Sequence, residues 1–273
     1  MKIKIMEYNI NRGFYNKEYT IHEKKRETNA IKVVKKENPD ILIILEAAFF
    51  KGNGYAKEKF GIIQDYQKLF GYSFMNFGRY PKKKGGVVIL SNMFLKSKNY
   101  CTPQRNHVKL WLKTRNKLLT IDVVHPSGHL NEEQKYQFIE KIFSQKNLIC
   151  EKDYMLIGDL NALSPQDKYS KQKLLSGFKK FDKNYKKTVE NFLKKKVVKY
   201  ILNKGLVDSY KQLHKKFDFT VPTGLISKHK LTAMRIDYIF CSTNMKIKDA
   251  KIIKNKFSDK ASGHYPIACT IEV

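Results

Sequence analysis

The stretch YMLIGDLN at residues 154–161 decides how the rest of this chain is interpreted. Its four apolar residues predict a buried strand, and Gly158 then begins a turn. Because side chains alternate along an extended backbone, Asp159 and Asn161 lie on the same side. Asp159 can take a proton from water, and Asn161 can donate its amide N–H to a phosphate oxygen. The same pattern is also common in ordinary turns, so other segments must decide its meaning.

Polar groups also stand at the ends of other predicted strands. Catalytic side chains favour such positions, because a rigid strand holds them in place. Two histidines, acidic groups and an asparagine together suit metal-assisted hydrolysis of a phosphoester. The groups are Asn9 near the end of 3–8, Glu46 after 41–45, His125 after 119–124, Asp237 within 235–240, and His264 before 265–267.

These segments, taken in order, resemble the endonuclease/exonuclease/phosphatase superfamily. That superfamily includes exonuclease III-type enzymes, pancreatic-type deoxyribonucleases, sphingomyelinases and inositol-phosphate phosphatases. No single segment is specific, but the order of all of them along nearly the whole chain is. The matching segments are residues 8–10, 39–46, 85–91, 125–126, 158–162, 235–238 and 262–266.

The resemblance implies an α/β (α+β) fold, a four-layer sandwich of two mainly antiparallel β-sheets packed face to face with helices outside. The active site would lie at one end of the sandwich. Strand and helix signals alternate without an internal repeat, so we expect residues 1–273 to form a single domain. The Lys-rich stretch near 163–204 is predicted to be a helical insert.

Local patterns predict individual elements of this fold. Helical periodicity covers residues 22–37, which Asn38-Pro39 ends, and a second helix runs from 131 to about 148. Residues 51–61 are rich in glycine and lysine and are predicted to form an exposed loop. The predicted strands are residues 2–10, 40–45, 72–77, 85–92, 107–113, 117–125, 235–241, 246–253 and 266–272.

Glu46 is the strongest candidate for a metal ligand. It directly follows five apolar residues, and a buried carboxylate is unfavourable unless it is paired or bound to a metal. The alternative is a solvated glutamate at a strand end. Asn9 would be the second metal residue, either binding the ion directly or supporting its ligand, with Asn11 as the rival. Oxygen ligands with open water positions suit Mg²⁺, and Mn²⁺ can substitute for it.

The resemblance implies the remaining roles. His264 would contact the scissile phosphate, and Asp237 would hold its far nitrogen and fix its tautomer. Asp159 would orient or deprotonate the attacking water, and Asn161 would bind a phosphate oxygen. His125 would contact the phosphate from the other side, unless it is only a loop histidine, and His129 lies nearby. Arg235 and Tyr238 are expected to bind the substrate.

One departure from the family pattern concerns the metal. The family usually has Asp immediately before the last histidine, whereas this chain has Ser262-Gly263-His264. Three interpretations stay open: the site uses fewer ligands, Asp259 replaces the missing carboxylate, or the chain is an impaired natural or engineered variant.

A second departure concerns the substrate. Glu46 is followed by Ala47-Ala48, and residues 219–223 lack the aromatic-rich segment of abasic-site enzymes. An abasic pocket is therefore disfavoured. The single tryptophan, Trp111, lies in an apolar strand and is expected to be a core residue rather than a platform for a base.

The charge points to a polyanionic partner. The chain carries 54 Lys and Arg residues against 25 Asp and Glu residues, a net charge of +29. Nucleic acid is the expected partner, an anionic membrane surface is an alternative, and a merely solvated basic surface is the third. Neither a signal peptide nor a membrane span is evident, so we expect a cytoplasmic monomer. The four cysteines are widely spaced, which disfavours a zinc site.

Three hypotheses for function follow. The first is a Mg²⁺-dependent nuclease acting on DNA or RNA. The second is a phosphatase or phospholipase-type phosphodiesterase acting on a small or lipid phosphate. The third is a catalytically weakened nucleic-acid-binding homologue, because Gly263 replaces the usual aspartate.

Overall fold

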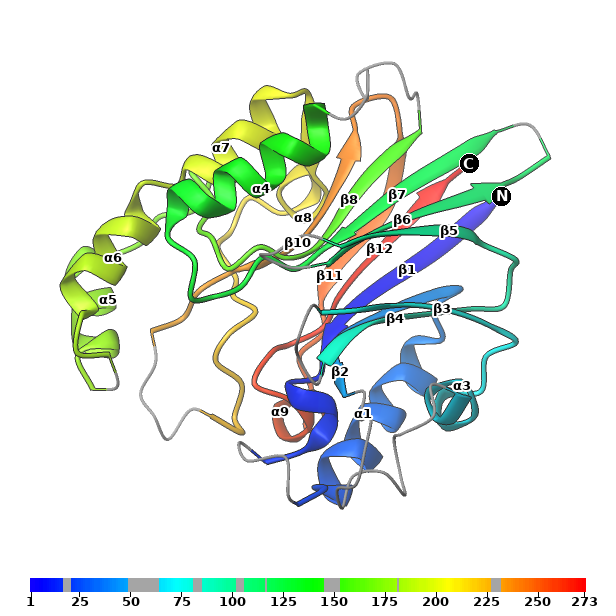
Figure 1. Ribbon diagram of the computed structural model, residues 1–273, viewed down its shortest axis with the longest axis horizontal. Coiled ribbons are helices and arrows are strands. Elements are labelled where there is room, and N and C mark those ends of the chain that lie inside the picture. Colours follow the sequence, from blue (N-terminus) through cyan, green and yellow to red (C-terminus); the bar gives the residue numbers. More distant parts are fainter. Residues whose placement is uncertain are drawn as a thin grey trace.

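The computed structural model of the protein describes residues 1–16, 21–48, 64–80, 85–101, 106–115, 117–144, 153–180, 182–226 and 232–273. Its strands form two six-stranded sheets, and helices lie against their outer faces (Figure 1). The predicted four-layer sandwich is therefore confirmed. The loop predicted at 51–61 lies outside the described residues.

In the first sheet, β1 and β2 run parallel and the other neighbouring pairs are antiparallel. The N- and C-terminal strands lie side by side, as Figure 1 shows, and the Met1 amino group donates to the Val273 carbonyl at 2.6 Å. Its strands, in spatial order, are β11 (Lys246–Ile252), β12 (Ile267–Glu272), β1 (Lys2–Asn9), β2 (Ile41–Ala48), β4 (Gly85–Ser91) and β3 (Phe74–Arg79).

The second sheet repeats this plan. Only β7 and β8 run parallel among its neighbouring strands. The predicted strands at 107–113 and 117–125 are confirmed as β6 and β7, which pair antiparallel. In spatial order the strands are β5 (Lys96–Cys101), β6 (Asn106–Lys113), β7 (Leu118–Val124), β8 (Tyr154–Asp159), β10 (Asp237–Ser242) and β9 (Leu206–Asp208).

Apolar side chains on alternate positions build the core. Ile3 and Ile5 of β1 face the second sheet and belong to the same buried cluster as Val108 of β6. Met6 faces outward and packs in the cluster that includes Val33 of α1 (Lys24–Glu37). Each such fully buried side chain contributes about 1.5–3 kcal/mol. Alternation therefore fixes which face of each strand lies inside.

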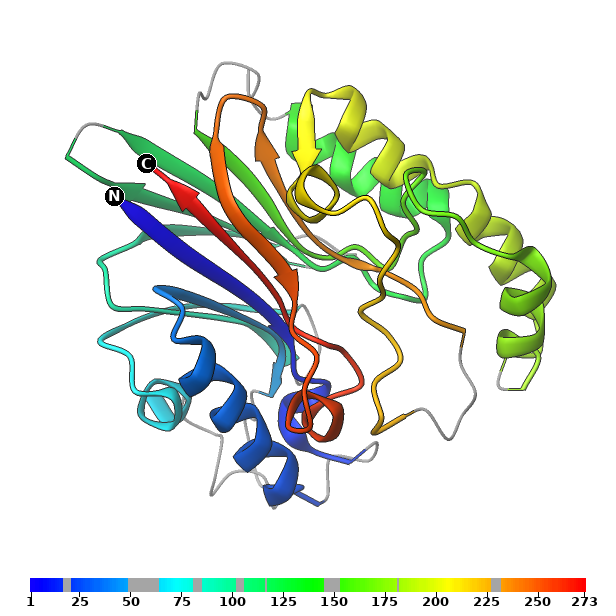
Figure 2. The same cartoon turned by 180° about the vertical axis from the view of Figure 1, so that it is seen from behind.

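Helices cover both outer faces. The helix α1 and α3 (Gln64–Phe70) cover the first sheet, and α4 (Glu132–Ser144) with α7 (Lys196–Asn203) cover the second. The Lys-rich stretch 163–204 contains three helices, α5 (Lys171–Phe178), α6 (Tyr185–Leu193) and α7, and Figure 2 shows α5 and α6 beyond the edge of the sheets. The short elements are η1 (Arg12–Phe14), α8 (Ser209–Leu213) and α9 (Ser258–Ala261). Among the described helices, none is long and apolar enough to cross a membrane.

Both parallel strand pairs end at the same end of the sandwich. Asn9 ends β1 and pairs in register with Leu45, the neighbour of Glu46. In the other sheet, Val124 at the end of β7 pairs with Gly158, so that His125 and Asp159 follow together. Because the sheets face each other, polar groups from separate parts of the chain meet here.

Gly158 permits the close approach of β7 and β8. Its φ is +152°, and an added Cβ would lie 1.8 Å from the carbonyl oxygen of Val124. No side chain larger than hydrogen fits in this space. The glycine before Asp159 is therefore required by the packing of two backbones next to the site.

We expect Gly158→Ala to lower the free energy of unfolding by about 3 kcal/mol or more, because the new methyl group overlaps backbone atoms that cannot move aside. Gly205→Ala is the control. Its φ is +82°, but an added Cβ would meet no described atom within 4 Å, so only backbone strain of about 1–2 kcal/mol applies. Urea denaturation of both variants measures the difference, and equal stabilities would contradict the packing argument.

Candidate active site

His264 and Asp237 form the pair that the sequence predicts. The imidazole Nδ1 of His264 lies 3.0 and 3.1 Å from the two carboxylate oxygens of Asp237, which is 1% exposed at the start of β10. Burial acts to lower the pKa of His264, but Asp237, Asp159 and Glu46 outweigh it and raise the pKa to about 9. His264 is therefore cationic at neutral pH, and its Nε2–H is the group left to face a substrate.

Asp159 lies directly opposite Asp237 on the neighbouring antiparallel strand. One Asp159 oxygen accepts from the Asn161 N–H at 2.8 Å, and the other accepts from the amide of Asn9 at 3.1 Å. Burial, followed by the charge of Asp237, raises the pKa of Asp159 to about 7. A carboxylate with this pKa can accept a proton from water near neutral pH.

Glu46 reaches the site through an irregularity in β2. The register between β2 and β4 shifts between Ile44 and Ala47, and Glu46 has a φ of +54°. Such a bulge re-aims a side chain, and strain of this kind collects at functional sites. The Glu46 side chain is 30% exposed, and burial is outweighed by His125 and His264, which lower its pKa.

Asn9 bridges the two acidic groups. Its amide nitrogen lies 3.1 Å from Asp159 and 3.4 Å from Glu46, and its oxygen accepts from the Asn11 N–H at 2.9 Å. The predicted second metal ligand is thus in the cluster, but its oxygen is already engaged. In this arrangement Asn9 orients the two carboxylates, and ligation through oxygen would require the amide to turn over.

His125 enters the cluster from the end of β7. Its Nε2 lies 3.6 Å from Asp159 and 4.0 Å from Glu46, and its Nδ1 lies 2.5 Å from the hydroxyl of Tyr80. The histidine is 2% exposed, so it is not a solvated loop residue. Tyr80 was not predicted, because an isolated tyrosine between two strands carries no local signal.

Asn161 is held in a strained conformation by a buried lysine. Its φ is +49°, its carbonyl accepts from Lys135 Nζ at 2.6 Å, and its amide donates to the Pro126 carbonyl at 3.2 Å. An amide has two N–H groups, so one is still available to a phosphate oxygen. Burial lowers the pKa of Lys135 despite the nearby Glu132 and Asp159. Sequence reasoning missed Lys135, which looks like any lysine on an amphipathic helix.

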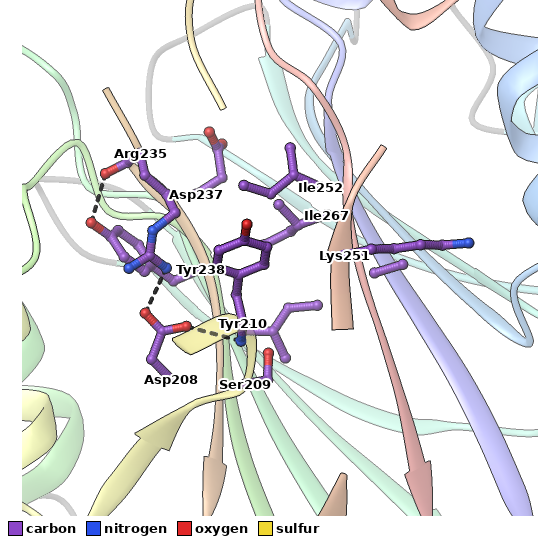
Figure 3. A pocket seen from close by; sticks show the side chains of 11 residues that line it. Asp208, Ser209, Tyr210, Arg235, Asp237, Tyr238, Lys251, Ile252 and Ile267 are labelled. Atoms are coloured by element: carbon purple, nitrogen blue, oxygen red, sulfur yellow. Dashed lines mark hydrogen bonds and ion pairs between the residues drawn. The ribbon is translucent and has the colours of Figure 1, made fainter. Parts of the chain in front are cut away.

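The structure does not bring Arg235 and Tyr238 to the cluster. Each is 1% exposed, and the guanidinium of Arg235 binds Asp167 at 2.7 and 2.9 Å. It also binds Asp208 at 2.5 Å, as Figure 3 shows. Tyr238 follows Asp237, so it faces the opposite side of β10, where its hydroxyl donates to the carbonyls of Ala162 and Arg235. That they bind substrate therefore stays a prediction, and the contacts in the structure give them a positioning role. They anchor the strand that carries Asp237.

The loop before His264 decides between two interpretations of Gly263. The Asp259 carboxylate accepts from the Gly224 N–H at 3.2 Å and from the Tyr265 hydroxyl, so it is not directed to the cluster. Gly263 itself does not have a left-handed φ, and an added Cβ would meet only side-chain atoms of Asn11 and Ile226, each at 3.2 Å. Asp259 therefore does not replace the missing aspartate in this arrangement.

The donor atoms fit a hard divalent cation. The carboxylates of Asp159 and Asp237 each offer an oxygen, and these oxygens and a ring nitrogen of His264 lie within 4.8 Å of one another, although His264 as a cation does not itself ligate a metal. Glu46 is the most accessible carboxylate beside them. Carboxylate oxygens are the ligands that Mg²⁺ and Mn²⁺ prefer. Asp159, Asp237 and Glu46 are therefore the residues that would hold such an ion.

Glu7 is an acidic residue that sequence reasoning missed. It is 0% exposed, and among the described residues neither carboxylate oxygen has a hydrogen-bond partner. Glu7 lies on the same inward-facing side of β1 as Ile3 and Ile5, two residues before Asn9. Burial, then Asp237 and Asp159, raises its pKa well above the ordinary value. The alternation of β1 was the signal that could have found it.

A two-sheet sandwich that gathers carboxylates and a His–Asp pair at one end defines a metal-dependent phosphoesterase. Residues 6–259 match the Endonuclease/Exonuclease/phosphatase family. The chain therefore belongs to this family, and the resemblance found in its sequence is confirmed. No curated protein sequence matches the chain.

Solved structures share the fold at low identity. An endonuclease/exonuclease/phosphatase family protein from Leptotrichia buccalis has a TM-score of 0.67 and 16% identity over 99% of this chain and 100% of its own. The D. rerio TDP2, complexed with single strand DNA product, has a TM-score of 0.65 and 15% identity over 100% and 99%. The Neisseria 3' phosphatase NExo, bound to a product DNA hairpin, has a TM-score of 0.62 and 17% identity over 99% of this chain and 100% of its own.

We expect Glu7→Gln to change how stability depends on pH. A raised carboxyl pKa means that the folded state binds more protons, so wild-type stability falls as pH rises above about 4.3, the ordinary glutamate value. The amide does not titrate, so the variant loses up to about 1.4 kcal/mol per pH unit of this slope.

Urea denaturation between pH 5 and 8, with chelator present, measures both slopes. The exposed Glu190→Gln on α6 is the matched control and should keep the wild-type slope. We compare the slopes of the free energy of unfolding against pH, and not the absolute values, because burying the glutamine amide changes the stability by the same amount at every pH. Identical slopes for wild type and Glu7→Gln would contradict the assignment.

We expect Gly263→Asp to tighten divalent-metal binding by roughly tenfold or more, the scale on which metal affinity responds to changed coordinating partners. The reason is that a carboxylate fits at this position beside His264 after a small shift of Asn11 and Ile226. Calorimetric titration with Mn²⁺ measures it without reference to turnover. Asp259→Asn is the control and should leave metal affinity unchanged. If Gly263→Asp leaves the affinity for Mn²⁺ unchanged, this loop faces away from the metal.

Proposed function

We propose that this protein is a Mg²⁺-dependent phosphodiester hydrolase that cleaves DNA or RNA, with Mn²⁺ able to replace Mg²⁺. The observation that carries the proposal is the meeting of a cationic His264, held by Asp237, with Asp159, whose pKa is about 7. An acid and a base with separated pKa values in one site are what hydrolysis near neutral pH requires.

The side chains divide the work of the reaction. Asp159 takes the proton of the attacking water, and the His264 Nε2–H stabilises the negative charge that develops on the phosphoryl oxygens. The second amide N–H of Asn161 positions one of these oxygens. A divalent cation, when bound, neutralises phosphate charge and lowers the pKa of its bound water. The active protonation state is most populated between pH values of about 7 and about 9.

Charge supports nucleic acid as the substrate. A net charge of +29 favours a polyanion over a small neutral molecule. Two proteins of the same fold were solved with DNA, TDP2 with single strand product and NExo with a product hairpin. The second is a 3' phosphatase, which keeps removal of a terminal phosphate as a second candidate activity.

We expect Mg²⁺ or Mn²⁺ to support cleavage of plasmid DNA or structured RNA, and chelator to abolish it. Asp159→Asn should reduce the rate by about 10²–10⁴-fold because it removes the base. The control is Asp249→Asn, an exposed change on β11 that should leave the rate unchanged. The panel also contains 3'-phosphorylated oligonucleotides and phospholipid headgroups.

The panel separates the remaining possibilities. Release of phosphate from oligonucleotide ends without strand cleavage would favour the phosphatase. Turnover of headgroups alone would favour the phospholipase-type activity. Binding of nucleic acid without any turnover would favour the weakened homologue. Full activity in excess chelator would contradict the metal-dependent mechanism.

A further inference from the structure

A cavity of about 600 Å³ is lined by residues of the segments that follow β8 and precede β10. Its walls include Tyr169, which follows Asn161 by eight residues, and Thr232, which precedes Asp237 by five. Five residues span at most about 18 Å, so the cavity lies within a few nucleotides of the reacting groups. None of the residues above that serve the reaction lines it.

Aromatic rings form one side of the cavity. Phe217 is 39% exposed, and it meets Tyr169 edge to face with ring centroids 5.4 Å apart. No described aromatic ring stacks in parallel on Phe217, and in an edge-to-face pair at least one face of the ring is left uncovered by the other ring. An exposed ring beside a cavity is a surface on which a flat ligand can stack.

The remaining walls suit an anion. Lys168 and Lys173 are exposed and line the cavity, and none of the described residues that line it is acidic. The hydroxyl of Thr232 donates to the Lys173 carbonyl at 2.6 Å, which ties α5 to the segment leading into β10. A ligand that combines a flat ring with negative charge matches these groups.

The cavity is fixed to the catalytic strand. Asp167, two residues before Tyr169, binds Arg235, which is two residues before Asp237. The two residues of this ion pair are buried, at 2% and 1% exposure. The cavity wall and the catalytic aspartate are therefore held by one interaction, so a strand bound in the cavity has a defined position relative to the site.

We propose that this cavity binds one nucleotide of a single-stranded segment next to the cleaved bond, with its base on Phe217 and its phosphate on Lys168 and Lys173. The inference rests on the proposed function, because it names the form of nucleic acid that the site takes. A base in a duplex has both faces covered by its neighbours, so only an unpaired base can stack here. The described residues of the lining do not form a pattern of donors that would select one base.

Binding of fluorescent oligonucleotides, DNA and RNA, tests the proposal in an Asp159→Asn background. A duplex with a single-stranded extension should bind more tightly than the blunt duplex. An abasic residue at one position of the extension should weaken binding by roughly 5- to 100-fold, the range for loss of one base on an aromatic platform. Phe217→Ala should weaken the intact oligonucleotide equally and lose sensitivity to the abasic residue.

Lysine variants give an independent measure. Lys168→Ala with Lys173→Ala should reduce the slope of log affinity against log salt by about 0.7 for each phosphate contact removed. Phe94→Ala with Lys96→Ala is the matched control, because both residues are exposed and lie beside Met1 at the far end of β1. Control affinities should equal those of the parent protein.

Failure of this proposal can be told apart from failure of the proposed function. Proteins with Asp159 restored should hydrolyse bis(p-nitrophenyl) phosphate, which lacks bases, at equal rates with and without Phe217→Ala. If the protein cleaves nucleic acid but abasic positions and Phe217→Ala have no effect on binding, the cavity assignment is overturned. If no nucleic acid is bound or cleaved in any arm, the proposed function itself fails.

Discussion

Two aspartates opposed on neighbouring strands set the main constraint on this structure. Asp159 and Asp237 pair in register across β8 and β10, and like charges placed opposite each other are unfavourable. His264 lies against both of them, at 3.0 Å from Asp237 and 4.0 Å from Asp159. The fold must therefore bring the loop after α9 to this end of the sandwich, because the acidic pair needs that cation.

Neighbouring polar groups also stabilise the two aspartates. Asn9 donates to Asp159, and Lys135 holds the carbonyl of Asn161, so hydrogen-bond donors surround the acidic groups. The buried Arg235 is paired with Asp208 and Asp167, so these two carboxylates, rather than the reacting groups, neutralise its charge. A buried ion pair contributes little net stability after desolvation, but breaking one is costly. Arg235 is thus better understood as fixing a position than as strengthening the fold.

Much of the fold and part of the site could be predicted from local patterns. Strands with alternating or continuous apolar residues, such as Ile41–Leu45, identify themselves because burial imposes a period on the sequence. Asp159, Asp237 and His264 stand next to such strands, so their meeting followed from strand ends sharing one edge. The burial of Arg235 and Tyr238 away from the cluster could not be foreseen, because a motif gives spacing along the chain but not which residues are covered by distant segments.

The sequence alone was enough to predict most of the strands, the polar residues at their ends and the basic character of the chain. It also required a glycine before Asp159, although the reason, the approach of Val124, is visible only in space. Only the tertiary structure shows that Glu46 lies on a bulge, that Asn9 presents its amide nitrogen, and that buried Glu7 has no hydrogen-bond partner among the described residues. These properties depend on contacts between residues far apart in the chain, and a pKa or a side-chain orientation is set by such neighbours rather than by residue type.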